Sequence, residues 1–100
     1  MGRRLHQMIR VKSGDWLLAS NDGATLWRMT KSTDGWELWG RPMFGSDAEL
    51  DAFDWDDWGL WDHHGTHASR QDAIDHAMDD VLLAPAREYE IRDGFLVPKT

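Results

Sequence analysis

The residues best suited to chemistry lie between positions 51 and 80, where carboxylates, tryptophans and histidines are concentrated. In the stretch DWDDWGLW, acids alternate with tryptophans, and further acids follow on a predicted helix. Carboxylates attract basic surfaces, and an exposed tryptophan can anchor a protein interface, so this pattern predicts a partner-binding surface. The same pattern also fits tryptophans that pack inward beneath solvated acids. The candidate contact residues are Asp54, Trp55, Asp56, Asp57, Trp58, Trp61, Asp72, Asp75 and Asp79.

These acids also support an alternative hypothesis, that the chain is a DNA mimic. Regularly placed carboxylates can imitate the phosphates of a duplex, whose charges recur every few ångströms. Such a protein would occupy the DNA-binding cleft of a regulatory or defence protein and inhibit it.

A histidine cluster gives a third hypothesis, a small metal-dependent hydrolase. Asp62, His63, His64 and His67 offer the nitrogen and oxygen donors that zinc and other first-row metals accept. Their spacing matches no established zinc signature, and Gly65 with the following helix cap favours a loop in which they do not converge. We therefore expect no resident metal or cofactor, and we interpret the histidines as solvated or core residues.

Other enzyme chemistry finds little support in the sequence. There is no cysteine to act as a thiol nucleophile, and Ser69 fits a helix cap better than a triad with His67 and Asp72. The glycines stand singly at turns, so no phosphate-binding loop is present. The sequence predicts a protein that is not an enzyme.

Charge is distributed unevenly along the chain. The net charge is −7 over 100 residues, yet residues 44–81 hold eleven acids against one arginine. This acidic half disfavours direct nucleic-acid binding and favours a partner with a basic surface. No apolar run reaches the length of a signal peptide or a membrane span, and the absence of cysteine fits a reducing compartment. We expect a cytoplasmic monomer or homodimer without membrane contact.

The longest predicted element is an amphipathic helix over residues 69–84. Apolar residues recur in it at helical spacing, Ser69 is suited to the N-cap position, and Pro85 prevents continuation. A shorter helix is predicted over residues 46–53, with Ser46 and Glu49 at capping-box positions and Leu50 and Phe53 on its buried edge.

Short strands separated by turn residues indicate an antiparallel sheet. Strands are predicted over residues 4–12, 16–19, 25–30 and 36–40, and a hairpin over residues 87–97 turns at Asp93 and Gly94. A further strand or ordered loop is expected near residues 59–62. The fold class is therefore α+β, one domain over residues 1–100. We expect a meander of about four strands plus a C-terminal hairpin, with the main helix on one face and a short second helix.

The sequence also resembles that of a group of known proteins. Its Trp-rich strands, its DGW and NDG turns and the helix start ASRQDAI, within residues 16–84, are similar to small orphan accessory proteins of actinobacterial phages. The resemblance implies a cytoplasmic protein, made during infection, that binds and modulates or inhibits a host protein.

Overall fold

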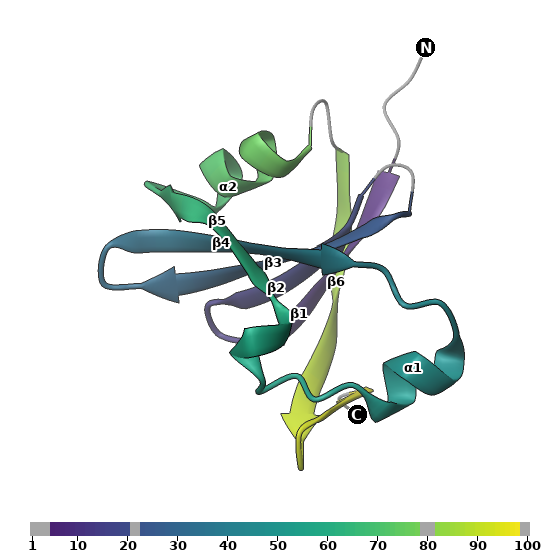
Figure 1. Cartoon of the computed structure of the whole chain (residues 1–100). Helices are drawn as coiled ribbons and strands as arrows, with labels where there is room; N and C mark the ends of the chain where they lie inside the picture. The colour runs from purple at the N-terminus through teal and green to yellow at the C-terminus, as the bar shows by residue number, and fades with distance from the viewer. Residues whose placement is uncertain (1–4, 21–22, 79–81, 99–100) are drawn as a thin grey trace.

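Antiparallel hairpins build most of the structure, which is a computed structural model that describes residues 5–20, 23–78 and 82–98. Seven strands form one sheet in the order β5-β4-β3-β2-β1-β6-β7 (Figure 1). The strands are β1 (Leu5–Lys12), β2 (Asp15–Ala19), β3 (Thr25–Ser32), β4 (Gly35–Pro42), β5 (Asp62–His67), β6 (Leu82–Arg92) and β7 (Phe95–Pro98). The helices are α1 (Asp47–Ala52), α2 (Arg70–Ala77) and the single-turn 3-10 helix η1 (Trp58–Leu60).

The predicted meander and C-terminal hairpin are confirmed. Strands β1 to β4 pair antiparallel in sequence order, and β6 pairs antiparallel with β7. Asp93 and Gly94 join β6 to β7 with φ of 54° and 85°. Two consecutive residues with positive φ match the twist of a tight hairpin, which explains why Asp-Gly stands there.

The sheet differs from the prediction in two respects, which are one parallel pairing and one additional strand. β6 pairs parallel with β1, so the sheet is mixed. The histidine segment, expected as a loop, is the edge strand β5, antiparallel to β4. The register of β1 on β6 shifts between Gln7 and Ile9, opposite the part of β6 that contains Pro85. A proline cannot donate to a ladder, so it is accommodated at an irregularity.

The main helix is shorter than predicted. Ser69 caps it as expected, because its side chain accepts a hydrogen bond from the backbone N–H of Asp72 at 3.1 Å. However, Met78 is already extended, and residues 82–84 belong to β6 rather than to the helix. Residues 79–81 lie outside the described part of the chain. A short apolar run fits a helix or a strand equally well, and here pairing with β1 decides for the strand.

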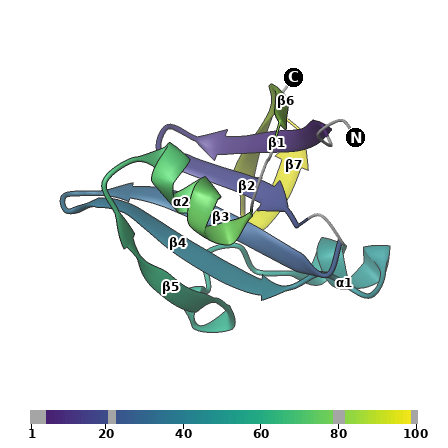
Figure 2. The ribbon, with the colours of Figure 1, turned by 90° about the horizontal axis from the view of Figure 1, so that it is seen from above.

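The two faces of the sheet are covered by different parts of the chain. Figure 1 shows α2 on one side of the sheet and α1 on the other, and Figure 2 shows α2 lying over the strands. The core under α2 consists of Met8, Leu18, Met29, Leu38, Ala73, Ile74 and Met78. The core on the opposite face consists of Val11, Leu17, Leu26, Phe53, Trp55 and Trp61. Both faces are therefore buried, whereas the sequence predicted a helix on one face only.

The short helix matches its prediction at the cap but not on its buried edge. The backbone N–H of Glu49 donates to Ser46 Oγ at 3.2 Å, and Glu49 Oε2 accepts from the N–H of Gly45 at 2.7 Å. Phe53 is buried as expected, but Leu50 is exposed. In the described residues, none of the helices has the length and apolar character that crossing a membrane requires.

Candidate functional site

A buried ion pair fixes the acidic, Trp-rich segment to the sheet. Arg28 on β3 donates from Nε and Nη2 to the two carboxylate oxygens of Asp15 on β2, at 2.9 and 2.7 Å. Both side chains are only 1% exposed. The remaining nitrogen, Nη1, donates to the backbone carbonyl of Trp55 at 2.7 Å. Because all three contacts use one rigid guanidinium, the position of residue 55 is set by the sheet beneath it.

Trp58 lies on the outer side of this arginine. The guanidinium carbon of Arg28 is 4.0 Å from the centroid of the Trp58 ring, and the Trp39 ring is 4.8 Å away, centroid to centroid. Trp58 is nevertheless 37% exposed. Cation–π attraction and ring contact on its inner side hold the indole in one orientation while part of it faces solvent.

The acids beside Trp58 point outward. Asp54, Asp56 and Asp57 are exposed, and among the described residues none of them forms an ion pair. Two of them also shape the loop, because Asp54 Oδ1 accepts from the N–H of Asp56 and Asp57 Oδ1 accepts from the N–H of Gly59, each at 3.0 Å. Trp58 therefore lies in a segment with three exposed carboxylates that no described cation pairs with.

Two predicted contact residues belong to the core instead. Trp55 is 1% exposed and Trp61 is 5% exposed, so neither can touch a partner in this conformation. The alternation of acids and tryptophans sends the acids to solvent and these two indoles into the core, which is the inward-packing interpretation. Both indoles contact Phe53 in edge-on geometry and lie tilted against each other, with ring centroids 5.0 to 6.0 Å apart.

The acids predicted on the main helix do not join this surface. Asp72 and Asp75 are exposed on α2, which lies on the opposite side of the sheet (Figure 1). Asp75 accepts a hydrogen bond from Gln71 at 3.0 Å. Asp79 falls outside the described residues. The predicted acidic surface is thus divided, and the candidate site is reduced to Asp54, Asp56, Asp57 and Trp58.

The histidine cluster is dispersed by the strand it forms. His63 lies 3.6 Å from the Glu37 carboxylate and beside Trp39, His64 contacts Trp27, and His67 contacts His76 of α2. Within residues 5–20, 23–78 and 82–98, no three His, Cys, Asp or Glu side chains are grouped so that they could hold a metal ion. The geometry gives no support to the metal-dependent hydrolase.

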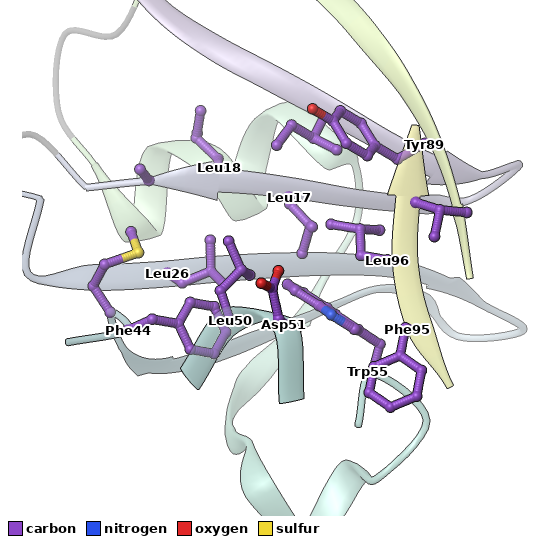
Figure 3. A pocket seen from close by; sticks show the side chains of 14 residues that line it. Leu17, Leu18, Leu26, Phe44, Leu50, Asp51, Trp55, Tyr89, Phe95 and Leu96 are labelled. Carbon is purple, nitrogen blue, oxygen red and sulfur yellow. The ribbon is translucent and has the colours of Figure 1, made fainter. Parts of the chain in front are cut away.

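A pocket that the sequence did not indicate lies on the same face of the sheet as α1. It has a volume of about 510 Å³ and is formed by β1, β2, β3, α1, Trp55 and the β6–β7 hairpin (Figure 3). Its lining residues are Ile9, Leu17, Leu18, Ala19, Leu26, Met43, Phe44, Leu50, Asp51, Trp55, Tyr89, Phe95, Leu96 and Val97. No local signal could reveal it, because its walls come from segments far apart in the chain.

No family model, curated protein or solved structure matches this chain. The resemblance to phage accessory proteins accordingly stays a prediction.

Proposed function

We propose that this chain is a non-enzymatic, acidic protein-binding module that docks on the basic surface of a host protein through Trp58, Asp54, Asp56 and Asp57. In line with the resemblance to phage accessory proteins, its role would be to modulate or inhibit that protein. The observation that carries the proposal is the partly exposed Trp58 indole, held by Arg28, in a segment whose acids Asp54, Asp56 and Asp57 are exposed and form no ion pair with the described residues.

The arrangement suits an interface anchor for an energetic reason. Ordering a large side chain at an interface costs free energy, and a side chain already held in its bound orientation avoids most of that cost. Trp58 is held by Arg28 and Trp39, and Leu60, which is 46% exposed, adds apolar area two residues away. Tryptophans in such positions dominate many interfaces.

The acids orient the approaching partner and raise the association rate, and they contribute less to the affinity than Trp58 does. Exposed carboxylates steer a basic partner toward the surface and discriminate against acidic ones. Their effect falls as salt is added, because exposed charges are screened within about 10 Å at 0.1 M ionic strength.

DNA mimicry ranks second. A mimic needs carboxylates spread along one continuous face, whereas Asp72 and Asp75 lie on the other side of the sheet from Asp54, Asp56 and Asp57. An aromatic anchor among the acids also fits a protein partner better than the phosphate backbone of a duplex.

The test is affinity capture from host lysate with three proteins of matched design. The first is the wild type, and the second combines Asp54→Asn, Asp56→Asn and Asp57→Asn. Asparagine keeps the side-chain oxygen that accepts the loop hydrogen bonds. The third, a control, combines Asp34→Asn, Asp72→Asn and Asp75→Asn, which changes three exposed acids elsewhere by the same charge.

We expect one protein that is enriched by the wild type and the control, and lost with the second variant and with Trp58→Ala. Its affinity should fall as salt rises. Equal capture by all variants, or binding indifferent to ionic strength, would contradict the proposal. Loss of partner binding when duplex DNA competes would favour the mimic.

A further inference from the structure

We infer that the 510 Å³ pocket is a binding site for a small amphiphilic cation, a molecule with an apolar body and one amine or guanidine group. The apolar body would occupy the pocket, and the cation would pair with Asp51. This activity goes beyond protein docking and uses different residues from the surface around Trp58.

The size and lining of the pocket are those of a small-molecule site. Ligand sites commonly measure about 300–1,000 Å³, are mainly apolar, and contain a few polar groups that fix orientation. Here the lining is aliphatic and aromatic except for Asp51 and Tyr89, whose hydroxyl is visible in Figure 3. A ligand that fills this space must therefore be largely apolar.

The pocket has a formed wall and an open mouth. The backbone N–H of Trp55 donates to the carbonyl of Gly94 at 3.0 Å, which fastens the β6–β7 turn to the segment after α1. Leu50 and Phe95, from α1 and β7, both line the pocket and are 37% and 44% exposed. Apolar side chains this exposed lose water contact favourably when a ligand covers them.

The sign of the ligand charge follows from Asp51. Figure 3 shows its carboxylate among the apolar side chains, close to Leu50 and Trp55. None of the described lining residues is a lysine or an arginine, and no described cation forms an ion pair with Asp51. The guanidinium of Arg41 lies over the rings of Phe44 and Phe53, and its Nε donates to the carbonyl of Pro42.

The charges of the segment that contains Asp51 act in the same direction as its carboxylate, whereas Arg41 beside Phe44 opposes them. Residues 44–62, which include α1 and the loop that follows, contain seven acids and no lysine or arginine. An anionic amphiphile such as a fatty acid would meet this field and an unpaired carboxylate at the pocket, and both disfavour it. A cation gains from both, and its charged end can stay at the mouth, because Asp51 is itself exposed.

The experiment compares three probes that share an eight-carbon chain: octylammonium, 1-octanol and octanoate. Each is titrated at pH 7 into the full chain, and backbone amide shifts are followed by NMR. We expect shifts at pocket residues, with octylammonium binding about fivefold more tightly than octanol, the value of one exposed ion pair. Octanoate should bind least.

Two substitutions on α1 separate the pocket charge from the general field. Asp51→Asn should bring octylammonium and octanol to nearly equal affinity. Asp47→Asn removes the same charge from an exposed residue of α1 that does not line the pocket, and should preserve most of the preference. Leu50→Ala should weaken all three probes together, because it removes apolar contact at the mouth.

Several results would overturn the inference. The inference is wrong if octanoate binds as tightly as octylammonium, or if Asp51→Asn keeps the preference for octylammonium over octanol. It is also wrong if no probe shifts the amide signals of pocket residues. Binding of the peptide acetyl-Lys-Leu-Leu-amide with the same Asp51 dependence, but not of octylammonium, would assign the site to a partner's side chain and reject the free ligand. Capture through Trp58 is unaffected by these outcomes, so the two proposals fail independently.

Discussion

The guanidinium of Arg28 lies 4.0 Å from the ring of Trp58, and through this contact a buried ion pair supports an exposed aromatic side chain. Arg28 is shielded from water by the tryptophan that it supports, and its partner Asp15 is equally buried. The stability of the fold and the position of the proposed docking residue therefore depend on the same side chain.

Replacing Arg28 should destabilise the protein severely. Arg28→Met leaves the Asp15 carboxylate buried without a partner, and such broken pairs cost about 3–5 kcal/mol of unfolding free energy. Urea unfolding monitored by tryptophan fluorescence measures the loss. The double variant Asp15→Leu with Arg28→Met removes both charges and should recover much of it. A single variant as stable as the wild type would show that the pair carries no such energy.

Trp58 and Trp61 should respond differently to truncation. Trp61→Ala removes a core ring that is 5% exposed and should cost about 3–5 kcal/mol. Trp58→Ala removes a partly exposed ring and should cost roughly 1 kcal/mol, mainly through the lost cation–π contact. Chemical denaturation of both variants measures the difference. Equal costs would indicate that Trp58 is structural and would weaken its assignment as an anchor.

Gly35 should tolerate alanine far less than Gly23. Both have positive φ, so each substitution carries a backbone cost of roughly 1–2 kcal/mol. A Cβ at Gly35 would also lie 2.3 Å from the carbonyl oxygen of His67, whereas a Cβ at Gly23 meets nothing within 4 Å. Relieving that clash requires β5 to move away from β4. Thermal unfolding of the two alanine variants should show Gly35→Ala as the less stable, and the reverse order would contradict the described pairing.

The cap of α2 should be worth a measurable amount. Ser69→Ala removes the acceptor for the N–H of Asp72 and should lower the unfolding free energy by about 1 kcal/mol. Ser69→Asp keeps an acceptor at the helix start and should restore most of it. The midpoints of denaturant unfolding, compared between variants with the same m-value, measure both changes in stability. An alanine variant indistinguishable from the wild type would mean that the cap adds nothing to stability.

Local signals explain which parts of the fold were predictable. The hairpins follow from turn residues such as Asp93 and Gly94, whose positive φ is a property of the turn itself. The start of α2 follows from Ser69, because its side chain caps the helix locally. The end of α2 does not, because residues 82–84 become a strand only by pairing with β1, at the other end of the chain.

The candidate site was predictable in its chemistry but not in its exposure. The acids and tryptophans of residues 54–61 were identified from the sequence, yet which indoles face solvent depends on Arg28, a residue of a distant strand. The pocket could not be foreseen, since Leu17, Asp51 and Leu96 meet only in three dimensions.

The parallel pairing of β1 with β6 also determines when the sheet can be completed during synthesis on the ribosome. Leu5 pairs with Leu82 and Arg10 with Glu88, so one edge of β1 stays open until most of the chain has been synthesised. Contacts between residues so distant in sequence form slowly, and an open strand edge invites association with other chains. A nascent chain that stops before β6 would therefore present an unpaired strand edge, through which it could associate with other chains.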